Sequence, residues 1–462
     1  MNKNGPDRPR MAGDGARCAA SMEPHPSGIL LVLILYVAGT SCAWGFFSWH
    51  GLTLALAAMA LTIRLHVRSD WRGPASEPML AGILVGCCAM GLVLAPTATG
   101  DPRLIVFIRV LAGLALIGAT AWLLPDRRFG RWAFPAMLLL AVAARVLVLY
   151  AVRYPPIDVF VSQTSVAIGL GEGMNGYAMT FTSPYQNIPS FDHYGYPPLT
   201  IYLNYLSWLF FKDVRAAWVI CELLAALCVY RLAARFRPEA RRWRELLALT
   251  ALFLPRALFV VEQSWTEPMV MLSLGALALA ASAAGSGSLA KGLAFGLLLS
   301  SKQYAVLLIP LVARLRRLRP AAWIIAFGLA GALALPFALW DFSAIKHDVF
   351  DFFLTSADRR DALSLYGAAI ALGRGLPWLL VTPLWLAGVA FFTWRMGTKA
   401  QNGGTAVPSL ARLLFAAAGM WMFFFLLGKQ AFMNYFHLVA YTLLLAAAAT
   451  PTPAEAQDAQ TP

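Results

Sequence analysis

The chain has 462 residues, of which 59% are hydrophobic and 13% are charged, and its formal net charge at pH 7 is +14. Soluble domains carry about 25% charged residues, so this composition excludes an ordinary soluble globular protein and favours an integral membrane protein. The basic residues stand in short runs between apolar stretches, as at 64–68 and 314–319. That placement is typical of the cytoplasmic loops of membrane proteins and argues against nucleic-acid binding.

The N-terminal part of the chain divides into a polar tail and an apolar region. Residues 1–27 are polar and basic, which predicts a disordered tail in the cytoplasm. A spanning helix needs about 20 apolar residues, and residues 28–125 hold four stretches that approach this length. We therefore expect four N-terminal transmembrane helices, at 29–44, 51–63, 79–94 and 104–124.

A fifth apolar stretch, 132–150, begins a longer region that runs over residues 130–450. A polar stretch, 153–198, follows it directly. The charge rule assigns the basic loops before this span to the cytoplasm, so the polar stretch is predicted to be extracytoplasmic.

The next apolar segment, 199–211, is predicted to lie along the membrane surface rather than to cross it. A crossing would carry the basic segment 231–244 to the outer side, against the charge rule. Tyr202, Tyr205 and Trp208 would then stand at headgroup depth. The long outer loop, with its surface helices, is therefore expected to cover residues 153–213.

The C-terminal half continues the pattern. Residues 289–313 are flanked by basic residues on both sides, which favours a hairpin of two short helices with its tip, Ser300–Gln303, pointing outward. The tail 451–462 is rich in Ala, Thr, Pro and Gln and is predicted to be disordered. Single spans are expected at 216–230, 246–261, 268–284, 321–339, 376–392, 413–427 and 436–449.

The sequence thus predicts an all-α, polytopic membrane protein with about 13–14 membrane segments. Both termini are expected in the cytoplasm. The Arg- and Ala-rich composition points to a bacterium, and so to its inner membrane. We expect a monomer.

Asp158 is the first candidate for chemistry, because it comes just after a spanning helix has ended on the outer side. Ionisable groups at membrane depth are costly and often functional. A solvated loop aspartate or a helix cap is the alternative.

The other candidates also stand in predicted outer turns. Lys302, in the hairpin tip, could hold a phosphate as a point charge or reach the headgroups as a lysine at a helix end does. Glu262 and Glu267 could bind sugar hydroxyls or pair with Arg256. Arg359 and Arg360 could clamp a phosphate or contact lipid headgroups.

Three further residues lie within apolar spans. His437 begins a span and could bind substrate or simply pack between helices, while Glu222 and Arg145 could neutralise partners. No metal-binding motif and no P-loop occur, so we expect no metal site and no ATP-driven transport.

The order and sidedness of these features resemble the GT-C-type glycosyltransferases, which use polyprenyl-phosphate sugars. The outer loop opens with an acidic residue and ends in Tyr196-Pro-Pro-Leu-Thr200, which is similar to a motif of the dolichyl-phosphate-glucose glucosyltransferases of N-glycan assembly. Ser301-Lys302-Gln303 resembles their Lys-Gln element. Gly173-Met-Asn-Gly-Tyr177 is similar to an element of bacterial and GPI-type mannosyltransferases. The resemblance covers roughly residues 130 to 450, so the four helices before it are additional.

The resemblance implies a GT-C-like catalytic module and an inverting transfer of a hexose from a polyprenyl-phosphate sugar to a lipid-linked or glycan acceptor at the outer face. The lipid-linked sugar is then a co-substrate, and no cofactor is expected. Asp158 would be the base, and Lys302, Arg359 and Arg360 would contact the donor phosphate. Substrate would be bound by Tyr196, Glu262, Glu267, Gln303 and His437.

A transporter or flippase of a lipid-linked saccharide is the alternative function. A transporter is expected to place its ionisable groups near the middle of the membrane, often at broken helices. Here most of them lie in outer loops or at outer helix ends, which favours the enzyme. Mannose, glucose and arabinose donors all remain open.

Overall fold

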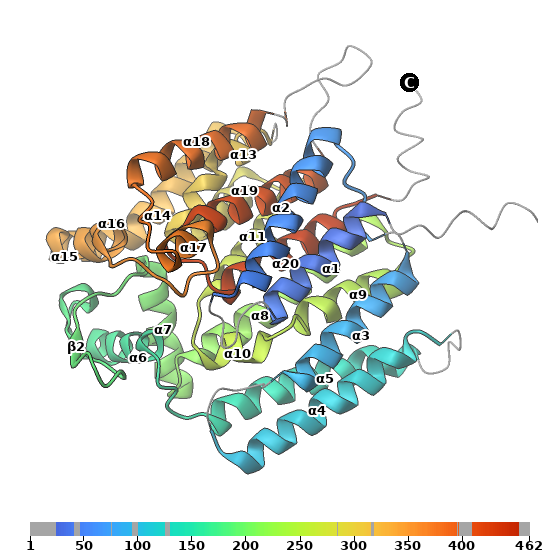
Figure 1. Cartoon of the computed structure of the whole chain (residues 1–462), viewed down its shortest axis with the longest axis horizontal. Coiled ribbons are helices and arrows are strands. Elements are labelled where there is room, and N and C mark those ends of the chain that lie inside the picture. Colours follow the sequence, from blue (N-terminus) through green and yellow to red (C-terminus); the bar gives the residue numbers. More distant parts are fainter. Residues whose placement is uncertain are drawn as a thin grey trace, which may run out of the picture.

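The computed structural model describes residues 25–40, 47–74, 76–94, 100–124, 130–283, 285–315, 318–394, 396 and 409–451. In this part of the chain helices dominate and pack side by side (Figure 1). The tails that the sequence predicts as disordered lie outside the described residues, apart from 25–27 and 451, and so do residues 125–129 and 397–408, each between two predicted spans.

Among the described residues, six helices are long and apolar enough to cross a membrane. They are α2 (Trp49–Arg68), α4 (Pro102–Ala121), α5 (Gly130–Ala151), α8 (Arg215–Phe236), α14 (Pro320–Trp340) and α19 (Leu410–Leu427). Seven shorter apolar helical segments accompany them: α1 (Pro26–Thr40), α3 (Glu77–Val93), α11 (Glu267–Ser282), α12 (Ser288–Leu299), η3 (Gln303–Leu308) with α13 (Ile309–Val312), α18 (Trp378–Trp394) and α20 (Met433–Ala448). This agrees with the predicted all-α, polytopic membrane architecture.

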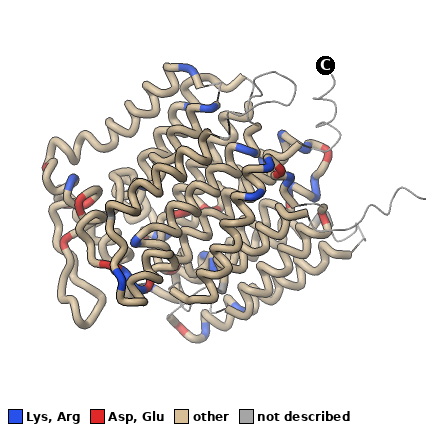
Figure 2. Tube along the Cα trace, turned by 45° about the horizontal axis from the view of Figure 1, so that its top comes forward, with Lys and Arg blue, Asp and Glu red and all other residues tan. Residues whose placement is uncertain are grey.

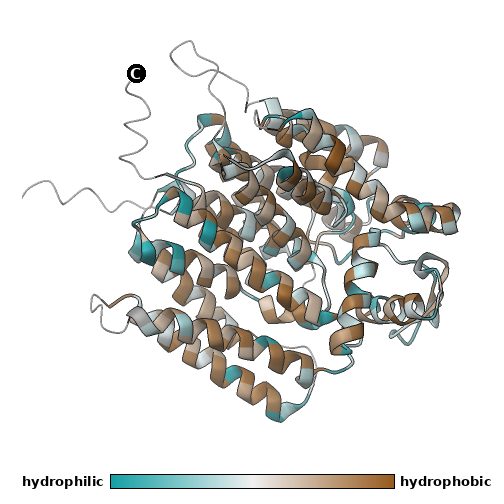
Figure 3. Cartoon of the chain, turned by 180° about the vertical axis from the view of Figure 1, so that it is seen from behind, coloured by the Kyte–Doolittle hydropathy of each residue, from teal (hydrophilic) through white to brown (hydrophobic). Residues whose placement is uncertain are grey.

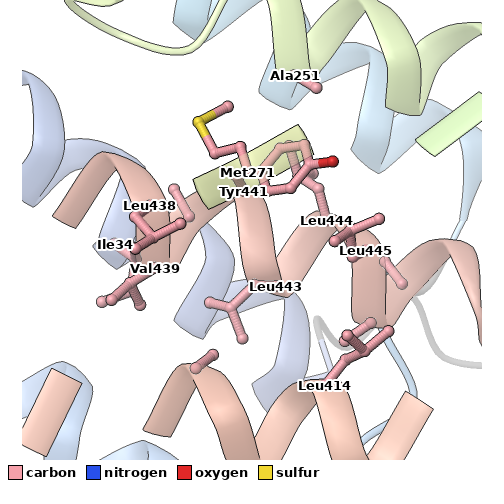
Figure 4. Packing of buried hydrophobic residues seen from close by; sticks show 14 of the residues in the cluster. Ile34, Ala251, Met271, Leu414, Leu438, Val439, Tyr441, Leu443, Leu444 and Leu445 are labelled. Atoms are coloured by element: carbon pink, nitrogen blue, oxygen red, sulfur yellow. The ribbon is translucent and has the colours of Figure 1, made fainter. Parts of the chain in front are cut away.

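The core of the bundle forms around α20, which packs against α1, α8, α11 and α19. Leu438, Val439, Leu443 and Leu444 point in different directions from this helix and are all buried (Figure 4). Helices at the edge behave differently, because many of their hydrophobic side chains are exposed. Figure 3 shows that the ribbons at the edge of the bundle are largely hydrophobic. An apolar outer surface of this kind suits contact with lipid tails.

The predicted span 246–261 is wrong in one respect, because the segment is not one continuous helix. The helix α9 (Arg241–Leu252) ends within it, and α10 (Ala257–Glu262) begins after a short break. Pro255 lacks the N–H that a helix interior needs, and Arg256 has a left-handed backbone with φ of 64°. Arg145 compensates the break, because its Nη2 donates to the carbonyl oxygen of Leu252 over 2.6 Å.

The stretch between α5 and α8 contains more structure than the sequence suggested. The predicted surface helix is confirmed as a helix, α7 (Pro198–Phe211), and it packs against α6 (Asp158–Gly171). Between them lie a short turn, η2 (Gly176–Ala178), and two antiparallel strands that the sequence did not predict. These strands, β1 (Phe181–Thr182) and β2 (Ser190–Phe191), are two residues each and leave the fold class unchanged.

Segments distant in the chain meet at one end of the bundle, which we call the loop end. It comprises residues 152–214, 263–266, 300–303, 341–377 and 428–432. The predicted hairpin tip lies here, because Gln303 Nε2 donates to the carbonyl oxygens of Gly195 and Val349 over 3.1 and 3.2 Å. Four short helices complete the loop end: α15 (Phe342–Lys346), η4 (His347–Asp351), α16 (Phe352–Thr355) and α17 (Leu365–Ala371).

The opposite end gathers the basic turns that the charge rule assigned to one side. Arg237 Nε donates to the carbonyl oxygen of Thr450 over 3.0 Å, and Arg412 Nη2 donates to Ser69 Oγ over 2.7 Å. Figure 2 shows most charged residues near helix ends rather than along the helices. These turns therefore share one end, and the assignment of that end to the cytoplasm stays a prediction.

Candidate functional site

Asp158 is the first residue of α6, at the loop end. Its Oδ1 accepts hydrogen bonds from the backbone N–H of Val159 over 2.9 Å and from the Tyr185 hydroxyl over 3.2 Å. The side chain is only half-buried. Asp158 therefore starts a helix and also presents a carboxylate that solvent or a substrate can reach.

The charge of this carboxylate affects the pKa values of three other side chains. Burial and then the Asp158 charge raise the pKa of Tyr185 to about 12. Burial lowers the pKa of His193, and Asp158 opposes that shift. A hydrogen bond to Asp361 raises the pKa of Arg359, and Asp158 raises it further. The Asp158 charge thus acts on a tyrosine, a histidine and an arginine.

The two predicted phosphate-binding arginines differ in their surroundings. Arg359 is half-buried, forms two hydrogen bonds to Asp361 at 2.8 and 2.7 Å, and lies 5.0 Å from the centre of the Phe432 ring. Its neighbour Arg360 is exposed, and no hydrogen bond, ion pair or ring contact of the described residues holds it. The structure therefore brings Arg359, but not Arg360, into the group around Asp158.

Lys302 is already paired. Its ammonium contacts Glu267 Oε1, with 8% of the lysine side chain and none of the glutamate side chain exposed. The second carboxylate oxygen, Glu267 Oε2, is buried and has no hydrogen-bond partner among the described residues. The expectation that Glu267 could pair with Arg256 is wrong, because Lys302 is its partner.

Three tyrosine rings surround the Lys302 ammonium, and we call them the tyrosine cage. The ammonium lies 5.7 Å from the ring centre of Tyr196, 5.6 Å from Tyr304 and 5.1 Å from Tyr435. Such distances allow cation–π attraction, which is strongest where water is excluded. The cage and Glu267 together hold the lysine in a dry, nearly neutral setting rather than as a solvated point charge.

Tyr196 connects the caged lysine with Asp158. Burial raises the pKa of its phenol, and the charges of Asp158 and Glu267 raise it further, so the ring lies near both carboxylates. Its position is fixed locally, because Gln303 binds the preceding carbonyl oxygen, that of Gly195. Gln303 thus acts in the structure as a bridge that positions the Tyr196 motif.

Two predicted site residues lie apart from this group. His437 is fully buried in α20, and its Nε2 stands 3.9 Å from Glu222 Oε1. Glu222 in turn accepts from Arg145 Nε over 2.7 Å, so the expected neutralisation of these two charges is confirmed. Glu262 is fully buried at the end of α10. We call Arg145, Glu222 and His437 the buried cluster.

Sequence reasoning missed several contributors to the loop-end site. Tyr185 and His193 lie in the irregular part of the outer loop, where no periodicity indicates a contact. Gln163, one turn further along α6 than Asp158, donates to the carbonyl oxygen of Ser264 over 2.9 Å and accepts from the Trp218 ring over 3.1 Å. The run Ser162-Gln-Thr-Ser165, which interrupts an otherwise apolar segment, was the available signal. Tyr304, directly after Gln303, could have been suspected for the same reason.

The arrangement offers a reachable carboxylate, a half-buried guanidinium in its field, and a dry ion pair framed by aromatic rings. A carboxylate of this kind can accept a proton from a hydroxyl group, and a guanidinium can bind a phosphate through paired hydrogen bonds. Comparison of the chain with protein-family models, with curated proteins and with solved structures finds no match.

Proposed function

We propose that the protein is an inverting membrane glycosyltransferase that moves a hexose from a polyprenyl-phosphate sugar to a lipid-linked or glycan acceptor, with a GT-C-like module over residues 130–450. The observation that carries the proposal is that Asp158 and Arg359 both lie at the loop end, where the Asp158 charge raises the pKa of Arg359 although Asp361 is the bonded partner of that arginine. A proton acceptor and a phosphate-binding cation are the two groups that this reaction needs most.

The chemistry assigns a role to each group. Asp158 takes the proton of the acceptor hydroxyl, whose oxygen attacks the anomeric carbon. The bond between that carbon and the phosphate oxygen breaks, and the polyprenyl phosphate leaves with the electron pair. The leaving phosphate is already stable, so one carboxylate suffices, whereas a retaining double displacement wants a second carboxylate about 5–5.5 Å away as nucleophile. Arg359 stabilises the phosphate charge as it develops.

The structure changes the role proposed for Lys302. Because Glu267 and the tyrosine cage already hold its ammonium, we assign the direct phosphate contact to Arg359. Tyr196 then forms the side of the site that binds sugar, and the buried Lys302–Glu267 pair supports this ring from behind; Glu267 Oε2 has no hydrogen-bond partner among the described residues, so a hydroxyl that reached it would be bound.

The setting of the reaction follows from the sidedness of the charges. We propose that the basic end faces the cytoplasm and the loop end faces outward, in the inner membrane of a bacterium. A donor whose lipid tail stays in the bilayer then presents its phosphate and sugar at the level of the loop end.

Substitution of Asp158 by Asn tests the proposal. The purified chain is reconstituted in vesicles with radiolabelled polyprenyl-phosphate mannose, glucose or arabinose and a bacterial lipid extract as acceptor source, and release of polyprenyl phosphate is measured. We expect Asp158→Asn to lower release by about 10²–10⁴-fold, the usual contribution of a general base. Glu172→Gln removes an exposed carboxylate near the other end of the same helix and serves as the matched control. Full release by the Asn variant would refute Asp158 as the base.

The buried cluster favours transport of a lipid-linked saccharide as a second candidate function. Arg145 and Glu222 lie inside the spans α5 and α8, and Arg145 also binds the carbonyl oxygen freed at the break between α9 and α10. Ionisable groups at a broken helix are a feature of transporters. A flipping assay with a fluorescent lipid-linked saccharide separates the two functions, because transport would fail in Glu222→Gln and persist in Asp158→Asn.

A further inference from the structure

A cavity lies between α3, α4, α5 and the break that separates α9 from α10. It is partly open to the outside, and its empty space, open solvent included, is about 590 Å³. The wall consists of apolar side chains apart from two cysteines and two arginines, Arg145 and Arg256. Small residues leave the space open where larger ones would fill it, and these are Gly91, Ala112, Ala115, Ala141 and Ala144.

The helices around this cavity are apolar enough to lie in a bilayer. Both α4 and α5 are candidate membrane spans, and in α4 only 17% of the most apolar window is buried inside the protein, so most of this helix lies at the outer surface of the bundle. An apolar cavity does not hold ordered water, because water there lacks polar partners. Lipid hydrocarbon is the apolar medium next to such helices, and it fills such a space with favourable dispersion contacts.

The two arginines make the wall suitable for a lipid that carries a phosphate. Arg145 forms an ion pair with Glu222, with 2.7 Å between Nε and Oε2, and it also donates to the carbonyl oxygen of Leu252 at the break. Arg256, which begins α10, donates through Nε to the carbonyl oxygen of Gly39 over 3.2 Å and lies 5.6 Å from the Phe259 ring centre. A guanidinium presents several N–H groups in one plane and is suited to a phosphodiester.

We propose that this cavity binds one acyl chain of a membrane phospholipid, with the headgroup phosphate on the side of Arg256. The bound chain packs the break between α9 and α10 against α3 and α4, which gives two of the four N-terminal helices a definite role. The proposal does not depend on the reaction at the loop end.

A photoactivatable phospholipid tests the site directly. The full chain is reconstituted in phosphatidylethanolamine and phosphatidylglycerol vesicles that contain a small fraction of phosphatidylethanolamine with a diazirine in one acyl chain. After irradiation, labelled peptides are mapped by mass spectrometry. We expect label on residues 252–259 and on α4 to exceed that on the lipid-facing helix α14 several-fold. Even labelling of all lipid-facing helices would overturn the proposal without any mutation.

A second experiment fills the cavity with a larger side chain. Ala112→Phe places a ring in the cavity and is expected to reduce the label on 252–259 several-fold. Ile117→Phe adds the same ring to the exposed side of the same helix, where Ile117 is 67% exposed, and should leave the label unchanged. Unchanged label in a folded Ala112→Phe variant refutes the site. Displacement of the probe by excess polyprenyl phosphate, but not by phosphatidylethanolamine, would overturn the assignment to a phospholipid.

Discussion

The loop-end site and the buried cluster use the same kinds of residue in opposite ways. At the loop end, Asp158 is half-buried and accepts hydrogen bonds from Tyr185 and its own helix, while Arg359 is held by a different carboxylate. In the buried cluster, Glu222 and Arg145 are both almost completely buried and bind each other directly. A carboxylate that keeps access to solvent can exchange a proton with a substrate. A carboxylate that is closed off with its partner mainly holds helices together.

The two regions also differ in how much stability is lost when one charged group is removed. Removing one member of a buried pair leaves the other charge without compensation, which costs much more than losing an exposed contact. The buried cluster should therefore dominate stability and the loop-end site should dominate turnover.

The largest effect is expected for Glu222→Gln. This change leaves the Arg145 charge without its carboxylate inside the membrane, and we expect a loss of about 3–5 kcal/mol in the free energy of unfolding. Thermal unfolding in detergent measures it as a lower melting temperature. Glu239→Gln, at an exposed carboxylate in the turn between α8 and α9, is the control and should leave the melting temperature unchanged. Equal melting of both variants would mean that the buried cluster does not stabilise the bundle.

The next effect separates two neighbouring arginines. Arg359→Ala should weaken donor use by about 1.5–3 kcal/mol, the value of a hydrogen bond to a charged group, and this appears mainly as a higher KM for the polyprenyl-phosphate sugar. Arg360→Ala should change KM little, because its side chain is exposed and makes no hydrogen bond or ion pair within the described part of the chain. If both variants raise KM equally, the two arginines form one clamp and the distinction drawn from the structure is wrong.

A double-mutant cycle measures the coupling energy between Lys302 and Glu267. Because the pair is dry and surrounded by the tyrosine cage, we expect a coupling of about 1–3 kcal/mol in stability between Lys302→Met and Glu267→Gln. The double variant should then be more stable than the sum of the two single losses implies. Strict additivity would show that the two side chains do not depend on each other.

The smallest effect is a pH dependence at the loop end. Burial lowers the pKa of His193 in the folded chain, so folding favours its neutral form. The contribution of His193 to stability is therefore complete above the unfolded value of about 6.5 and is lost as pH falls from there toward the folded pKa. Hydrogen exchange of residues 190–197 should accelerate between pH 7.5 and 5.5 relative to α20. His193→Gln should abolish that difference, and a persistent difference would assign it to another group.

Hydropathy alone could predict most of the helices and their grouping, because a bilayer demands long apolar segments and basic turns on one side. The break before Arg256 escaped prediction, since Leu254 and Ala257 are as apolar as a continuous span would be. Pro255 marked the position, but the break is stabilised by a hydrogen bond from Arg145, which is distant in sequence. For the same reason the sequence could place Lys302 in a tip without revealing that Glu267 neutralises it.

Adjacent arginines pose a different difficulty. Nothing in the local sequence distinguishes Arg359 from Arg360, because neighbouring residues in an irregular turn can point in any direction. Only the tertiary contacts with Asp361 and Phe432 select one of them.

The most direct test of the division between the two regions is to measure polyprenyl-phosphate release and melting temperature on Asp158→Asn and Glu222→Gln side by side. We expect Asp158→Asn to lose release while melting with the wild type. Glu222→Gln should melt at a clearly lower temperature and keep release at temperatures where it remains folded. Retained release in Asp158→Asn, with loss of release in folded Glu222→Gln, would contradict this assignment and move the function to the buried cluster.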